Sequence, residues 1–102
     1  MDKITHPYSA NAAILTVITN ESGAIYVALP DIICQSVRFF NETATSLRIG
    51  NTNVAAGLDY IILPSGRAED IHVRQNANEL FVKRNDDSNT QVTVRFQVKG
   101  SK

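Results

Sequence analysis

The sequence predicts an all-β fold: a single-domain β-sandwich or jelly-roll-like barrel of seven to eight short antiparallel strands. Apolar and polar residues alternate in several short runs, which is the period of a strand with one buried face. Turn-forming residues separate these runs at intervals of roughly 8–12 residues. The chain of 102 residues has the length of one domain, and no segment shows clear helical periodicity.

The domain is expected over residues 12–99, preceded by a polar N-terminal arm at residues 1–11 and followed by a short tail at residues 100–102. The first strands are expected at Ala13–Thr19 and Ala24–Leu29, on either side of an Asn-Glu-Ser-Gly turn. The alanines near residue 12 also allow a short helix, but the β-branched run that follows them argues against it.

Four further strands are expected in the middle of the chain: Cys34–Asn41, Ser46–Ile49, Tyr60–Leu63 and Ile71–Arg74. Phe40 breaks the alternation of the first of these, which predicts a bulge or burial on both faces. The third strand ends at Pro-Ser-Gly, because proline fixes φ and glycine accepts a left-handed conformation.

The clearest strand lies near the C-terminus, where Val92, Val94, Phe96 and Val98 alternate with polar residues. A second alternating run, Leu80–Arg84, precedes it. Between the two stand five consecutive turn formers, Asn-Asp-Asp-Ser-Asn, whose short side chains can hydrogen-bond the backbone of a turn. We therefore predict that Glu79–Lys99 forms a β-hairpin.

Composition excludes several classes of function. Ten basic residues balance ten acidic ones, whereas a surface that follows nucleic-acid phosphates normally has a basic excess. No apolar stretch approaches the ~20 residues needed to span a bilayer, and the start of the chain lacks the features of a signal peptide. Neither nucleic acid nor membrane is expected as a partner, and synthesis in the cytoplasm is expected.

No arrangement of reactive side chains predicts an enzyme. His6 lies in the arm, His72 is expected to face solvent, and neither has a second ligand at metal-binding spacing. Cys34 lies in an apolar run and is interpreted as a buried thiol. Asp86 and Asp87 lack the spacing of a calcium loop and are explained by turn formation. No catalytic residue, metal or cofactor is expected.

Five arginines remain on or beside the expected strands: Arg38, Arg48, Arg74, Arg84 and Arg95. Such a stripe could stack on nucleotides if aromatic residues were interleaved with it, but the tyrosines are scattered. Arginines on a sheet face more commonly form cross-strand pairs or part of a protein interface.

Several motifs resemble one known group of proteins: S-V-R-F-F-N from Ser36, L-R-I-G from Leu47, L-P-S-G from Leu63, E-D-I-H-V from Glu69 and N-E-L-F-V from Asn78. In their order and spacing they are similar to small virion proteins of tailed bacteriophages. The resemblance covers residues 34 to about 98 and leaves the N-terminal third uncovered.

The resemblance implies a capsid decoration (cement) protein, or a related minor head protein, on the surface of the virion. Its partner would be the major capsid protein or another virion protein, and it would be a homo-oligomer, with a trimer favoured. An all-β module with edge strands to cover fits this role. As interface residues we expect Arg38, Arg48, Tyr60 and Tyr8.

Two alternatives stay open from the sequence. The first is another virion role, as a tail, adaptor or fibre-base component. The second is a ligand-binding β module for a glycan or a cell-surface target, which is less favoured because the chain has no tryptophan on which a sugar could stack.

Overall fold

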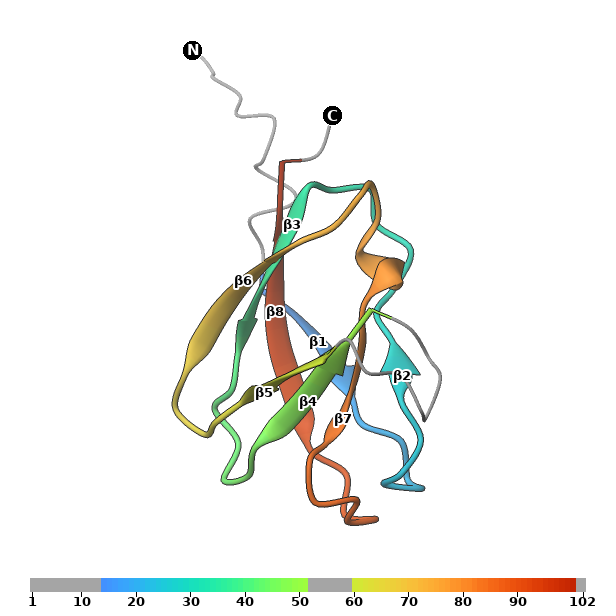
Figure 1. The fold of residues 1–102 in the computed structure, drawn as a ribbon, viewed down its shortest axis with the longest axis vertical. Helices are drawn as coiled ribbons and strands as arrows, with labels where there is room; N and C mark the ends of the chain where they lie inside the picture. The colour runs from blue at the N-terminus through green and yellow to red at the C-terminus, as the bar shows by residue number, and fades with distance from the viewer. Residues whose placement is uncertain (1–13, 52–59, 101–102) are drawn as a thin grey trace.

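The computed structural model describes residues 14–51 and 60–100 and confirms the all-β prediction (Figure 1). Eight strands form two four-stranded sheets, and one short 3₁₀ turn, η1, precedes the seventh strand. The strands and the turn are β1 (Leu15–Ile18), β2 (Val27–Ala28), β3 (Ser36–Phe40), β4 (Leu47–Gly50), β5 (Tyr60–Leu63), β6 (Ala68–His72), η1 (Ala77–Glu79), β7 (Phe81–Arg84) and β8 (Thr93–Lys99).

The two sheets have the strand order of a jelly roll. One sheet runs β1-β8-β3-β6 and the other β2-β7-β4-β5, and every pairing is antiparallel. Consecutive strands therefore cross from one sheet to the other, except β4 and β5, which are neighbours. Two interleaved Greek keys produce this order. The predicted sandwich of short antiparallel strands is confirmed, in its jelly-roll form.

The predicted hairpin over Glu79–Lys99 is wrong, because β7 and β8 lie in different sheets. Both strands turn apolar residues to the same core, but from opposite sides of it. The turn formers between them belong to a connection that crosses the sandwich, across a spacing of roughly 10 Å. Asn89 fixes this connection to the β1–β2 turn by accepting a hydrogen bond from the Gly23 amide at 2.9 Å. Only glycine fits there, since a Cβ on Gly23 would meet the Ser88 carbonyl oxygen at 1.9 Å.

Most strands are shorter than predicted by a residue or two at an end, and two differ more. β2 has only two residues, and β6 begins at Ala68 rather than at Ile71. Pairing with β3 sets the limits of β6, in a register that joins Phe40 to Ala68 and Ser36 to His72. That register is continuous, so the bulge considered at Phe40 does not form. The N-terminal helix alternative is also wrong for the described residues 14–17, which lead into and form β1.

The core lies between the two sheets. Phe39 of β3 and Phe96 of β8 are fully buried, and their ring centroids lie 6.4 Å apart. Aliphatic side chains from both sheets surround these rings. The buried apolar residues are Leu29, Cys34, Val37, Phe39, Leu47, Ile49, Leu63, Ala77, Leu80, Val82, Val94, Phe96 and Val98.

Asn41, directly after β3, joins the two sheets at the side where β5 turns into β6. Its side chain is buried and donates to the carbonyl oxygens of Thr45, at 2.9 Å, and Leu63, at 2.8 Å. The backbone carbonyl oxygen of Asn41 accepts a hydrogen bond from the backbone amide of Gly66, and the backbone amide of Asn41 donates to the carbonyl oxygen of Arg67. One residue thus holds the end of β5 and the corner that follows it against the other sheet.

We expect Asn41→Ala to lower the free energy of unfolding by about 2–4 kcal/mol, because buried carbonyl groups lose their donors. Asn51→Ala is the matched control, since Asn51 is exposed and a surface change of this kind costs less than about 0.5 kcal/mol. Urea denaturation of both variants measures the difference. Equal losses in the two variants would contradict the role of Asn41.

Candidate functional site

The sandwich is open on the side where β5 and β6 meet. These are edge strands, one in each sheet, and the corner held by Asn41 connects them. From this corner the two strands run apart (Figure 1). Apolar side chains between the sheets are consequently less covered here: Ile61 is 40 % exposed and Ile71 is half-buried.

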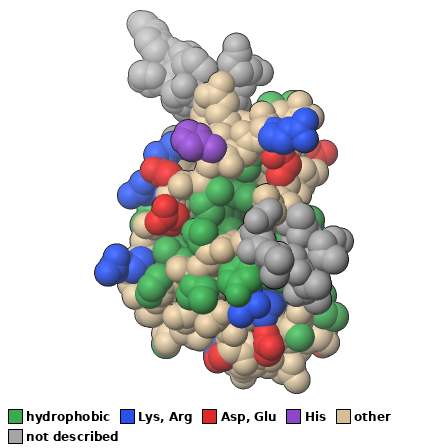
Figure 2. Space-filling view, in the orientation of Figure 1, with side chains coloured by type: hydrophobic (Ala, Val, Ile, Leu, Met, Phe, Trp, Pro, Cys, Tyr) green, Lys and Arg blue, Asp and Glu red, His purple; other side chains and the backbone are tan. Residues whose placement is uncertain are grey.

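β5 exposes apolar side chains on both of its faces. Ile61 lies opposite the core residue Ile49 and faces inward, whereas Tyr60 and Ile62 face outward. Tyr60 is 38 % exposed and Ile62 is 49 % exposed. We name these three residues, Tyr60, Ile61 and Ile62, the β5 edge. Figure 2 shows hydrophobic side chains gathered on this face, over the region where β5 and β6 run.

A groove of about 350 Å³ opens between the two strands. Its lining is Ile49, Gly50, Asn51, Tyr60, Ile61, Ile71, His72 and Leu80. A larger, more polar hollow of about 840 Å³ adjoins it beside η1 and shares Asn51, His72 and Leu80 with it. The apolar groove and the β5 edge form one continuous surface, because Tyr60 and Ile61 belong to both.

Arg48 and Tyr60, two of the expected interface residues, are in contact. The guanidinium carbon of Arg48 lies 4.3 Å from the centre of the Tyr60 ring. The same guanidinium donates to Asn85 Oδ1 at 3.0 and 3.3 Å. A cation–aromatic contact at a surface stabilises by about 0.5–1 kcal/mol. Arg48 therefore fixes the position of the tyrosine at the start of the β5 edge.

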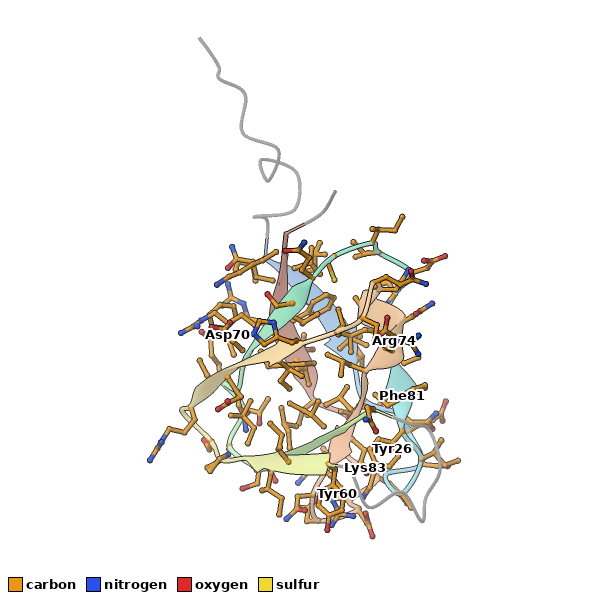
Figure 3. All side chains as sticks on the ribbon, turned by 45° about the horizontal axis from the view of Figure 1, so that its top comes forward. Tyr26, Tyr60, Asp70, Arg74, Phe81 and Lys83 are labelled. Carbon is orange, nitrogen blue, oxygen red and sulfur yellow. The ribbon has the colours of Figure 1, made fainter. Side chains whose placement is uncertain are left out.

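Lys83 continues this cation–aromatic pattern across the outer face of the sheet. It lies opposite Arg48 in the β4–β7 register, 5.7 Å from the centre of the Tyr26 ring. Figure 3 shows Tyr26, Lys83 and Tyr60 on the same side of the molecule. Lys83 is only 5 % exposed, and its ammonium group pairs with Asp87. Its charge is thus neutralised within the subunit and is not presented to a ligand.

Arg38, another expected interface residue, lies on the other sheet and does not meet Arg48 or Tyr60. It is on β3 and forms an ion pair of 2.7 Å with Asp70 across the β3–β6 pairing. Arg38 thus forms one of the cross-strand pairs that the sequence predicted as a possible role of these arginines, beside a role in a protein interface. The fourth expected interface residue, Tyr8, and the arm at residues 1–11 lie outside the described residues.

Cys34 is buried and His72 is exposed, as the sequence predicted, whereas His6 lies outside the described residues. Cys34 is 1 % exposed, and burial raises the pKa of its thiol, with a smaller contribution from the charge of Glu79. His72 is exposed on β6. Within residues 14–51 and 60–100, no three His, Cys, Asp or Glu side chains are grouped as a metal site. No helix in this part of the chain is long and apolar enough to cross a membrane.

Glu79 closes the turn beside the polar hollow. Its carboxylate accepts hydrogen bonds from the backbone amides of Arg74, Gln75 and Asn76 at 2.7–2.9 Å. Partial desolvation raises the pKa of Glu79, but these three donors and the charge of Arg74 outweigh it, and the net pKa is lowered. These hydrogen bonds to the Glu79 carboxylate hold η1 in place beside the hollow.

The sequence did not identify Ile61, Ile62 and Ile71 as parts of a surface. A signal was present in Tyr60–Leu63, which is apolar throughout and does not alternate. Such a run indicates either a strand buried on both faces or one that exposes apolar side chains. Only the position of β5 at the edge of its sheet distinguishes the two.

No protein-family model, curated protein or solved structure matches this chain. Its function is therefore inferred from its residues and its fold.

We expect Glu79→Gln to lower the urea midpoint at pH 7, because an amide oxygen accepts the three backbone hydrogen bonds less strongly than a carboxylate. The carboxylate has a lowered pKa when folded, so its contribution is present above the unfolded value near 4.5 and is lost as pH falls through the folded value. The difference between the midpoints of the variant and of the native protein should therefore shrink between pH 7 and pH 3.

The control is Glu69→Gln, because Glu69 is exposed on β6 and its side chain forms no hydrogen bond or ion pair within the described residues. It should leave the midpoint nearly unchanged at both pH values. A difference between Glu79→Gln and the native protein that stays constant from pH 7 to pH 3 would contradict the assignment.

Proposed function

We propose that this protein is a non-enzymatic structural protein of a bacteriophage virion, specifically a capsid decoration (cement) protein that binds the outer shell as a homo-oligomer. The observation that carries the proposal is the uncovered apolar surface formed by the β5 edge and the adjoining groove. Contiguous apolar surface on a small soluble domain is typical of a site that another protein covers.

The jelly-roll strand order supports the proposal at the level of the fold. Jelly rolls occur in viral capsid proteins, but also in lectins and cupins, so the fold alone does not decide the function. The chemistry of the surface favours the structural role. Four of its eight lining residues are isoleucine or leucine, beside Asn51 and His72, and its one tyrosine is held by Arg48. Aromatic and arginine residues are enriched in protein interfaces.

A repeating shell suits a surface of this modest size. Each copy can bind weakly, because a lattice of identical sites holds many linked copies through avidity. The formal net charge of zero allows copies to crowd on a shell without strong mutual repulsion. The major capsid protein is the proposed partner, and the family resemblance favours a trimer as the oligomer. The protein would be made in the host cytoplasm and then reside on the capsid surface.

The two alternative roles are less favoured. Among the described residues, Tyr60 is the most exposed of the tyrosine and phenylalanine side chains, and Arg48 already stacks on its ring. A free aromatic platform for a sugar is therefore lacking in this part of the chain. A tail, adaptor or fibre-base role would use the same apolar surface, and locating the protein on particles by electron microscopy separates it from a head role.

We expect the full-length protein to co-sediment with expanded shells of its parent phage. Removing residues 1–11 should weaken this attachment by about tenfold or more, equal to ~1.4 kcal/mol, if the arm adds contacts to the shell or to a neighbouring subunit. Far-ultraviolet circular dichroism should stay β-rich.

Removal of residues 101–102 is the matched control for truncation and should not change binding. A full-length chain that is monomeric and stays in the supernatant with mature shells would contradict the proposed function. If removal of residues 1–11 left binding unaltered, only the proposed role of the arm would be contradicted, and the proposed function would stand.

A further inference from the structure

The outer edge of β5 has unpaired backbone groups. On its other side β5 pairs with β4. Within the described part of the chain, the backbone groups of Tyr60, Ile61 and Ile62 form no hydrogen bond outside that pairing. An edge of this kind can accept another strand, and proteins commonly block it with charged side chains, bulges or proline.

The β5 edge lacks such protection. Tyr60, Ile61 and Ile62 carry no charge, and Pro64 comes only after the strand ends. The edge of the other sheet on this side differs, because β6 carries Glu69 and Asp70. Of the two edges that meet at the open side, β5 is therefore the one suited to pair with a further strand.

From this geometry we propose that two copies of the protein pair through their β5 edges, antiparallel and around a two-fold axis at Ile61. The two β2-β7-β4-β5 sheets would then form one continuous sheet across the axis. This two-fold dimer is an alternative to the trimer that the family resemblance favours, and it does not require that a capsid shell be the partner.

Side-chain alternation restricts the register. Residues directly opposite each other in an antiparallel pair share a face of the sheet. Ile61 faces inward and Tyr60 and Ile62 face outward, so an inward residue must oppose an inward residue of the second copy. With the axis at Ile61, this residue opposes the partner's Ile61, and Tyr60 opposes the partner's Ile62.

This register covers all three exposed residues at once. Each Tyr60–Ile62 pair is an aromatic–β-branched cross-strand pair, a favourable combination. An axis one residue further along would place Tyr60 opposite the partner's Pro64, which has no backbone N–H to donate. Of these two registers, the one centred on Ile61 is therefore favoured.

The area indicates a weak dimer. The exposed fractions of Tyr60, Ile61 and Ile62 correspond to roughly 200–250 Å² of side chain per subunit. A stable specific dimer buries about 800 Å² per partner, which is several times the area that these three side chains supply. We expect dissociation in the micromolar range or weaker, and stronger pairing where copies are held close together on a lattice.

Cysteine cross-linking tests the pairing and its register. Ile61→Cys places two thiols directly opposite each other, with Cα atoms about 4.5–5.5 Å apart, within the range of a disulfide. Under mild oxidation this variant should become a covalent dimer on a non-reducing gel, even if the reversible dimer is weak. The native Cys34 is buried, so the unmodified protein should stay uncross-linked in the same experiment.

Two matched variants serve as controls. Ile62→Cys lies on the same strand, but its diagonal distance to the same residue of the partner is roughly 7–8 Å, too far for ready closure. Ile33→Cys is 63 % exposed and lies away from β5, in the connection before β3. Both should cross-link at least about tenfold more slowly than Ile61→Cys.

A fourth variant tests the same contact without a new thiol. Ile62→Lys adds a charge on the outward face, next to Arg48 in the β4–β5 register. Sedimentation equilibrium at concentrations up to about 500 µM should show a concentration-dependent dimer for the native protein and a monomer for this variant. Ile62 is half-exposed, so circular dichroism of the variant should remain native.

Three results would overturn the inference: no preferential cross-link at residue 61, a native protein that stays monomeric, or a trimer that Ile62→Lys leaves intact. An edge already occupied by the arm of the same chain would give the second result. If the protein binds shells but fails these tests, the pairing is wrong and the proposed function stands. If it forms the cross-linked dimer but does not bind shells, the pairing stands and the proposed function is wrong.

Discussion

Asn41 joins the two sheets at the side where both of them end, and the form of the open surface depends on it. With its side chain buried, it binds the carbonyl group at the end of β5, while its backbone binds both residues that lead into β6. These bonds hold the two edge strands together at the corner that connects them. Beyond the corner β5 and β6 separate, and Ile61 and Ile71 lie between them without the cover that the rest of the core receives.

The charges of the described residues serve mainly the fold. Arg38 pairs with Asp70, Lys83 with Asp87 and Arg95 with Glu42, so the two outer faces carry internal ion pairs. Surface pairs of this kind contribute little stability individually, but they leave few unpaired charges to recruit a partner. What the subunit offers to another molecule is therefore apolar surface and an unpaired strand edge.

Local pattern predicted the strands better than their partners. The strand predicted from the alternation in β8 and the end of β5 predicted at Pro-Ser-Gly are both confirmed, because both depend on neighbouring residues alone. The hairpin between β7 and β8 was wrong, because a turn-rich loop is equally suited to closing a hairpin and to crossing a sandwich. The contact of Arg48 with Tyr60 depends on the β4–β5 register, and the exposure of Ile61 depends on β5 being an edge. Neither property is local in the sequence.

Amide hydrogen exchange measures most directly whether β5 is an uncovered edge that a second molecule covers. In dilute protein, the backbone amides of Tyr60–Ile62 that point away from β4 should exchange much faster than the amides of β8. β8 is a central strand with a neighbour on each side. Their protection should rise with protein concentration, while that of β8 stays constant. If β5 were as protected as β8 in dilute solution, and independent of concentration, the subunit would already cover this edge by itself and the account would be contradicted.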